Sequence, residues 1–96
     1  MNIQEFAELV ETQQLERLIK DHPGMPQPEF YCKTTIKPGK KYIKVDVGSS
    51  GKFMVDEHGN IWGIKAYGVI HKGHHYGTLD TINNYYWGDY HPQKIS

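Results

Sequence analysis

The chain has 96 residues, of which 38% are hydrophobic and 23% charged, a composition that suits one globular domain (residues 1–96) and argues against wholesale disorder. Eleven basic and eleven acidic residues cancel, so no net charge attracts the chain to DNA or to an acidic membrane. The single cysteine excludes an internal disulfide framework, and no window reaches the ~18 apolar residues of a membrane span. Because the first residues also lack a secretory leader, we expect a soluble, cytoplasmic protein with no membrane partner.

Residues 2–22 are predicted to form an amphipathic helix. Asn2 and Glu5 have the spacing of a capping box, and His22-Pro23 ends the helix because the residue before proline is pushed out of the helical region. The apolar residues recur every three or four positions and share one face: Ile3, Phe6, Leu9, Val10, Leu15, Leu18 and Ile19. We expect this face to pack on a sheet; a partner-binding or dimerising helix is the alternative.

Residues 23–29 contain three prolines and are predicted to be an extended linker, after which a β-meander is predicted over residues 30–82. Its strands are expected at 30–36, 42–47, 53–55 and 61–67, and Lys72-Gly73 is expected to turn the chain into a further strand at 75–79. In residues 42–47, the alternation places Ile43, Val45 and Val47 on one face and Asp46 on the other. Together these elements predict an α+β fold, with an N-terminal amphipathic helix packed on a small, strongly bent antiparallel sheet of four to six strands.

Two glycine-containing segments of the meander carry further expectations. Gly63 lies inside a predicted strand and indicates a bulge or a close backbone approach. The segment Gly48-Ser49-Ser50-Gly51-Lys52 resembles a phosphate-binding P-loop at first sight. A P-loop opens a helix, whereas this segment leads into an alternating strand, so a hairpin is predicted instead.

An aromatic C-terminal tail is predicted over residues 83–96, where Tyr85, Tyr86, Trp87 and Tyr90 lie within six positions. The favoured interpretation is packing in the core or at a sheet edge, because a small domain needs large side chains to bury enough area. A contact with a partner protein and stacking on unpaired bases are the alternatives.

The densest polar cluster is His71-Lys72-Gly73-His74-His75-Tyr76. On a regular strand His71 and His75 point the same way and His74 the opposite way, so at most two imidazoles converge and no metal site or cofactor is predicted. A histidine-based nuclease that uses His74 or His75 with Lys72 is conceivable. No spacing supports it strongly, and no catalytic residue is assigned.

Charge is unevenly distributed along the chain. Acidic residues dominate residues 2–22, whereas residues 33–52 carry six lysines against Asp46. Such lysines could neutralise phosphates, but the zero net charge and the lack of an arginine stripe argue against a dedicated nucleic-acid-binding protein. A chain with one acidic and one basic flank can instead orient a partner.

Two stretches, KYIKVDVGSSGKFMVDEHGNIWGIKAYG and VIHKGHHYGTLDTI, resemble a group of small proteins carried by bacteriophages and plasmids. The shared pattern is YxKVDxGxSGxxMV…GIKxYG…HxGHxYGTLDT, and it covers about residues 41–82 but not the helix. The resemblance implies a genomic setting rather than a mechanism. Small proteins of mobile elements often bind and block a host defence machine, and anti-CRISPR proteins are among them.

The leading hypothesis is therefore a non-enzymatic inhibitor of a host protein or ribonucleoprotein complex in a bacterial cytoplasm. The alternatives are a small nucleic-acid-binding accessory protein and a histidine-based or metal-dependent enzyme. A homodimer is compatible with an exposed strand edge. The candidate partner-binding residues are Lys40, Lys41, Lys44, Lys72, His74, His75, Tyr76, Tyr85, Tyr86, Trp87 and Tyr90.

Overall fold

The fold begins with one long helix, α1 (Ile3–Asp21), close to the range expected from the sequence. The structure is a computed structural model that describes residues 2–48, 50–66, 69–88 and 92–95. The Asn2 side chain accepts a hydrogen bond from the Glu5 backbone N–H at 2.9 Å, which satisfies one of the unpaired donors of the first turn. Among the described residues no helix is long and apolar enough to cross a membrane.

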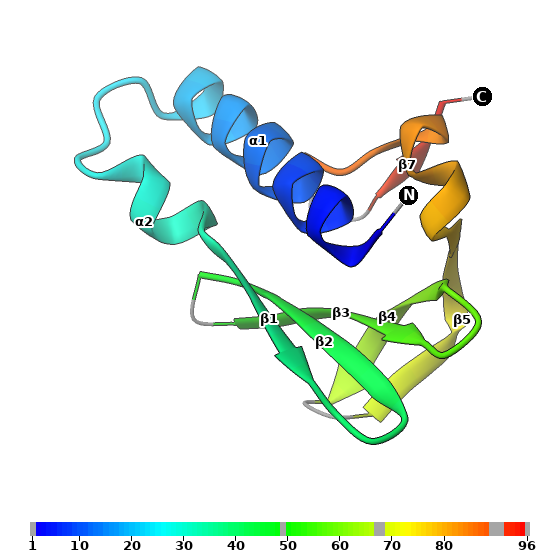
Figure 1. The fold of residues 1–96 in the computed structure, drawn as a ribbon. Coiled ribbons are helices and arrows are strands. Elements are labelled where there is room, and N and C mark those ends of the chain that lie inside the picture. The colour runs from blue at the N-terminus through cyan, green and yellow to red at the C-terminus, as the bar shows by residue number, and fades with distance from the viewer. Residues whose placement is uncertain (1, 49, 67–68, 89–91, 96) are drawn as a thin grey trace.

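Five antiparallel strands form one sheet in which each strand pairs with its neighbours in sequence (Figure 1). They are β1 (Thr34–Pro38), β2 (Tyr42–Val47), β3 (Ser50–Asp56), β4 (Asn60–Ala66) and β5 (Val69–Thr78). Register shifts interrupt the β2–β3 and β4–β5 pairs, and such bulges bend strands and increase their twist. With α1 packed on the sheet, the predicted small α+β architecture is confirmed.

Helix α2 (Pro28–Cys32) replaces the end of the predicted linker and the beginning of the predicted first strand. Pro28 occupies the start of this short helix, where its fixed φ suits the helix and its missing N–H costs nothing. The strand prediction from residue 30 was therefore wrong at its N-terminal end, and β1 begins at Thr34. The consequence is that Phe30 and Tyr31 lie on a helical turn outside the sheet.

The β2–β3 hairpin forms as predicted, but a bulge between Val45 and Asp46 breaks the simple alternation of β2. Val45 is fully buried, and Asp46, which was predicted to lie on the outer face, is only 6% exposed. Its carboxylate lies 3.3 Å from the Lys37 Nζ on β1, and this ion pair offsets part of the cost of burying the charge.

Strand β5 runs continuously through Lys72-Gly73, so the predicted turn at this position was wrong. Trp62 pairs with His75 and the next residue, Gly63, pairs with His71. One residue step along β4 therefore corresponds to four residue steps along β5. The three extra residues of β5 form an irregular bulge within the strand. The predicted irregularity at Gly63 is confirmed, since a Cβ there would lie 3.0 Å from the His74 Cβ.

The C-terminal segment folds back towards α1. After β5 come the 3-10 helix η1 (Leu79–Asn84) and a small second sheet that pairs β6 (Tyr85–Tyr86) with β7 (Gln93–Lys94). A capping box at Thr78 and Thr81 starts η1, so residues 79–82 leave the predicted meander and form a helical turn.

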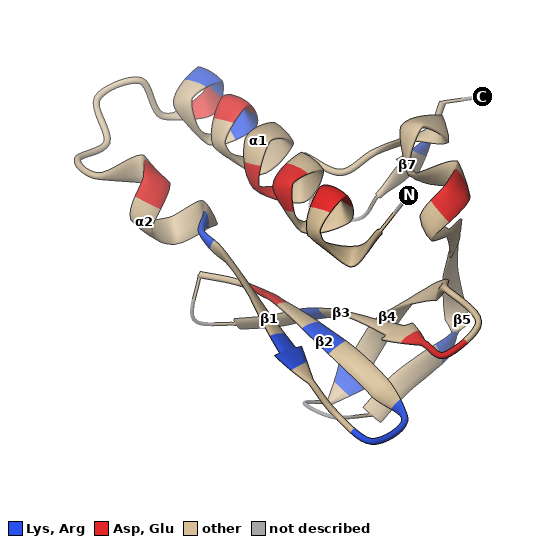
Figure 2. Cartoon of the chain, in the orientation of Figure 1, with Lys and Arg blue, Asp and Glu red and all other residues tan. Residues whose placement is uncertain are grey.

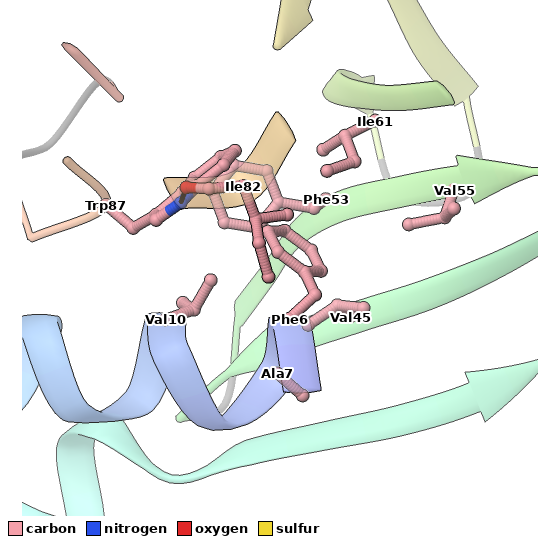
Figure 3. Packing of buried hydrophobic residues seen from close by; sticks show 9 residues of the cluster. All are labelled: Phe6, Ala7, Val10, Val45, Phe53, Val55, Ile61, Ile82 and Trp87. Carbon is pink, nitrogen blue, oxygen red and sulfur yellow. Dashed lines mark hydrogen bonds between the residues drawn. The ribbon is translucent and has the colours of Figure 1, made fainter. Parts of the chain in front are cut away.

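A compact aromatic core joins α1, the sheet and this C-terminal segment (Figure 3). Its buried members are Phe6, Ala7, Val10, Val45, Phe53, Val55, Ile61, Ile82 and Trp87. Trp87 is fully buried and makes edge-on contacts with Phe6 and Phe53, with ring centroids 4.9 and 5.5 Å away. Its Nε1 donates to the Ile82 carbonyl at 2.9 Å, so the indole is satisfied in the interior. Trp87 is therefore a core residue in the folded chain and offers no surface to a partner.

Candidate functional site

Four lysines of the β1–β2 hairpin form the basic hairpin, defined as Lys37, Lys40, Lys41 and Lys44. Lys40 and Lys41 lie in the exposed turn, and the Lys41 Nζ lies 5.5 Å from the centre of the Tyr42 ring. Lys37 and Lys44 are directly opposite each other in the strand register, an arrangement of like charges that destabilises a sheet. The Asp46 carboxylate beside Lys37 offsets part of this repulsion.

The acidic and basic segments also lie apart in space. Figure 2 shows the acidic residues of α1 along the helix and the lysines of the basic hairpin at the far end of the sheet. A molecule of zero formal charge thus holds its acidic helix apart from its basic hairpin. Charge separation of this kind orients a partner during encounter more than it adds affinity.

The histidines do not gather on one side of β5. The rings of His71 and His74 stack at 4.0 Å with an interplanar angle of 15°, because the bulge turns them towards the same side. The His75 ring instead packs on Trp62 at 4.6 Å, and its Nε2 lies 3.2 Å from the Asn60 Oδ1. The expectation that His71 and His75 would share a side was wrong, since it assumed a regular strand.

The described part of the chain contains no group of three or more His, Cys, Asp or Glu side chains arranged to hold a metal ion. Cys32 is buried, and burial together with the nearby Glu11 carboxylate raises the pKa of its thiol. A thiol in this environment is a poor nucleophile, because the thiolate is the reactive form.

Asp56 organises the β3–β4 turn. Its Oδ1 accepts hydrogen bonds from the His58 and Asn60 backbone N–H groups at 2.9 Å, and its Oδ2 accepts from the Asn60 Nδ2 at 3.1 Å and the Trp62 Nε1 at 3.2 Å. Burial by itself raises the pKa of this carboxyl, but the four hydrogen bonds outweigh it and lower the pKa below its ordinary value. The geometry is that of a turn-stabilising carboxylate.

A solvent-open pocket of about 380 Å³, here called the donor pocket, lies between α1 and strands β3, β4 and β5. Among the described residues, the polar side chains that line it carry hydrogen-bond donors: Gln14, Ser50, Lys52, His74 and Tyr76. The Gln14 amide already donates to the Trp87 carbonyl. The apolar part of the lining comes from Val47, Phe53, Ile64 and Pro92. Burial lowers the pKa of the Lys52 ammonium and raises that of the Tyr76 hydroxyl.

Of the candidate residues that the structure describes, His74 and Tyr76 line this pocket. Lys72 is exposed in the β5 bulge, while Tyr85 and Tyr86 are half-buried in β6. Tyr90 lies outside the described residues.

An exposed aromatic pair on α2 was missed by sequence reasoning. Phe30 is 70% exposed and Tyr31 54% exposed, and their rings meet edge to face with centroids 5.6 Å apart. Glu29 and Phe30 also line a shallow pocket with Lys33. The signal that could have revealed the pair is Pro28, which is typical of the first position of a helix and separates these residues from the strand.

The chain matches no protein-family model, and no curated protein and no solved structure is significantly similar to it.

Proposed function

We propose that this protein is a non-enzymatic binding protein of a mobile element that occupies a surface on a host nuclease or defence complex, in the manner of an anti-CRISPR protein. The genomic setting of this proposal comes from the resemblance of residues 41–82. The choice of a binding function comes from the surface of the molecule.

The observation that carries the proposal is the aromatic pair Phe30 and Tyr31, which is 70% and 54% exposed. Aromatic side chains are enriched among the residues that dominate protein–protein binding energies. Burial of such a ring in a complex contributes about 1.5–3 kcal/mol. An aromatic pair of this size on a short helix outside the sheet is therefore suited to anchor a partner.

The basic hairpin supplies the charged part of the proposed interface, beside the aromatic pair. Lys40 and Lys41 are exposed at its tip, and Lys37 and Lys44 oppose each other despite their like charge. Exposed charges at the rim of an interface mainly speed association and select the partner. We infer that the partner presents an acidic patch to the basic hairpin.

A protein partner is favoured over a nucleic acid because of the surroundings of the aromatic pair. Glu29 lies next to Phe30, and Glu11 lines the same shallow pocket. Lys33 lines this pocket too, but the two carboxylates outnumber it and repel the phosphates that would accompany bases stacked on the ring. A protein surface can satisfy both the aromatic pair and the basic hairpin, whereas a polyanion suits only the hairpin.

The test is affinity capture from a bacterial host lysate with the tagged protein, with nucleic acid digested in a parallel sample. The captured complex is identified and assayed for nuclease activity with and without added protein. We expect the double variant Phe30→Ala/Tyr31→Ala and the double variant Lys40→Glu/Lys41→Glu each to lose capture and inhibition. Thermal unfolding would establish that both variants stay folded.

Matched controls are available in the same chain. Ile95 is 63% exposed and Lys94 is exposed on β7, so Ile95→Ala and Lys94→Glu change comparable surfaces away from α2 and the basic hairpin. Both controls should capture the complex as the unmodified protein does. Undiminished capture by the Phe30→Ala/Tyr31→Ala variant would refute the proposed role of the aromatic pair.

The second candidate function, nucleic-acid binding, is favoured by the basic hairpin alone. If its four lysines each neutralise one phosphate of a single strand, affinity should fall roughly 50-fold between about 50 mM and about 200 mM salt. Fluorescence anisotropy with a labelled oligonucleotide measures this slope. Loss of capture after nuclease digestion, together with this slope, would select the second function over the first.

A further inference from the structure

We propose that the outer edge of β1, here called the β1 edge, binds an extended acidic segment of the partner protein as an added β-strand. This inference rests on the proposed binding function and names the mode of recognition. In the described part of the chain, β1 pairs with β2 alone, so its other side lies at the margin of the sheet (Figure 1). A strand at such a margin presents backbone N–H and C=O groups with which a further strand can pair.

The hydrogen-bond pattern of the β1–β2 pair shows which backbone groups point outwards. The Gly48 N–H donates to the Lys33 carbonyl at 2.8 Å across the end of the pair. In an antiparallel pair, hydrogen-bonded and non-hydrogen-bonded positions alternate along each strand. Because Lys33 is a bonded position, Thr34 is a non-bonded one, and its backbone groups point away from β2. The Thr34 N–H agrees with this direction, since it donates to the Glu11 Oε1 on α1 at 2.7 Å.

The same alternation turns the backbone groups of Ile36 and Pro38 outwards. Proline has no N–H, and the Thr34 N–H is already bonded to α1. The β1 edge therefore offers one donor, the Ile36 N–H, and three acceptors, the carbonyls of Thr34, Ile36 and Pro38. Thr35, Lys37 and Pro38 are exposed, which leaves room for a strand to approach. An extended segment, whose N–H and C=O groups alternate along its edge, matches this set.

The charges along β1 favour an acidic segment. Lys37 lies directly opposite Lys44, and the Lys37 Nζ already pairs with the buried Asp46 carboxylate at 3.3 Å. This part of the sheet thus carries two lysines against one carboxylate, and Lys40 and Lys41 in the exposed turn add two further positive charges. An Asp or Glu side chain beside Lys37 on the added strand would bring a second carboxylate to the row. Opposite charges on neighbouring strands stabilise their pairing.

The β1 edge also joins the two surfaces of the proposed interface. Helix α2 precedes β1 directly and the turn of the basic hairpin follows it, so one segment laid along the edge reaches both. The five residues of β1 span roughly 17 Å in extended conformation. Glu11 and Glu29 lie at the α2 end, beside Phe30. The segment that fits is therefore apolar at the α2 end and acidic at the end of the basic hairpin.

A second copy of the chain is a poorer occupant of the β1 edge. In a self-pairing centred on Ile36, the Lys37 residues of the two copies lie diagonally across from each other, where like charges repel. The basic hairpins of the two copies also carry the same charge. A segment of opposite charge on another protein avoids both costs.

Amide hydrogen exchange of the full chain, measured by NMR, tests the β1 edge without any host protein. The probe is a short synthetic peptide of alternating Val and Glu, and the control peptide has Lys in place of Glu. Without peptide, the outward Ile36 N–H should exchange rapidly, whereas the Thr35 and Lys37 N–H groups, which point towards β2, should exchange slowly. We expect the acidic peptide at about 1 mM to slow Ile36 exchange at least about twofold, since a complex with a Kd of about 1 mM is then half-formed.

Three outcomes would overturn the inference. Unchanged Ile36 exchange with the acidic peptide would show that the edge does not accept a strand. Equal slowing by the lysine peptide would show that the edge does not select an acidic segment. Slow Ile36 exchange that depends on protein concentration in the absence of peptide would assign the edge to a second copy of the chain.

Two variants at one position isolate the outward donor. Ile36→Pro and Ile36→Ala both lose the isoleucine side chain, but only the first loses the outward N–H, and an edge strand tolerates proline where the N–H faces away from the sheet. We expect Ile36→Pro to bind the acidic peptide at least about fivefold more weakly than Ile36→Ala. Equal binding by the two folded variants would contradict the assignment. If Ile36→Pro does not fold, the exchange measurement on the unmodified protein decides.

The outcomes also separate this inference from the proposed function. A host lysate that yields no captured complex contradicts the proposed function. An Ile36 N–H that the acidic peptide does not protect contradicts the β1 edge, whether or not a complex is captured.

Discussion

Replacement of Trp87 by alanine tests whether the C-terminal segment is part of the core. Trp87 is fully buried, and its indole packs against Phe6 and Phe53 and donates to the Ile82 carbonyl. Truncation of a buried Trp costs about 3–5 kcal/mol, and the lost hydrogen bond adds about 1 kcal/mol. A 96-residue domain has a total stability of about 5–14 kcal/mol. We therefore expect Trp87→Ala to be largely unfolded or to lose at least about 15 °C in Tm.

Urea unfolding followed by far-UV circular dichroism measures this loss, and the second tryptophan is its matched control. Trp62 is half-buried on the opposite face of β4, where it packs on His75 and donates to Asp56. Because less of its area is buried, Trp62→Ala should lose only about 1–2 kcal/mol. A loss below about 1 kcal/mol for Trp87→Ala, or one no larger than that of Trp62→Ala, would refute the packing argument.

Three further predictions concern the backbone, the pH dependence and the cysteine. Gly77 has φ +72°, and a Cβ there would lie 2.4 Å from the Thr81 Oγ1, so Gly77→Ala should destabilise the protein by about 2 kcal/mol in urea unfolding. In the control Gly24→Ala, the new Cβ would have no atom within 4 Å, and stability should change by less than about 0.5 kcal/mol. Because the pKa of Asp56 is lower in the folded than in the unfolded protein, ionised Asp56 stabilises the fold above the ordinary carboxyl pKa, and this stabilisation is lost as the pH falls through the folded-state pKa. Below about pH 4 the free energy of unfolding of the unmodified protein should therefore fall more steeply with pH than that of Asp56→Asn. Equal slopes for the two proteins would contradict this role. Cys32 is buried with a raised pKa, so a thiol reagent should label it only after unfolding; rapid labelling of the folded protein would show that the thiol is accessible.

The helix and the central hairpins could be predicted because their signals are local. Asn2 and Glu5 cap α1, and the alternation of residues 42–47 matches β2. The C-terminal limit of the buried helix face was less predictable. Ile19 belongs to the apolar face in sequence but is 48% exposed, because the sheet does not extend beneath the end of α1 (Figure 1).

The errors share a physical cause: glycine and proline have more than one structural use. Lys72-Gly73 has the composition of a turn, but in β5 the glycine serves a bulge within a continuous strand. Pro28 looked like part of an extended linker, but it starts α2 and thereby exposes Phe30 and Tyr31. In each case the neighbouring strand or helix decides between the two uses.

By itself, the sequence determined the helix, the hairpins of the antiparallel sheet and the separation of acidic and basic segments, because periodicity and charge are properties of neighbouring residues. Only the tertiary structure decided which aromatics are core and which are surface, and which donors share a pocket. Trp87 is buried because the chain returns to α1, where Gln13 and Gln14 bond its backbone. The donor pocket likewise joins residues from Gln14 to Pro92. Contacts between residues so far apart in the chain depend on every bulge and turn between them, because each one changes the direction of the chain. These changes of direction produce no periodic pattern in the sequence of the contacting residues.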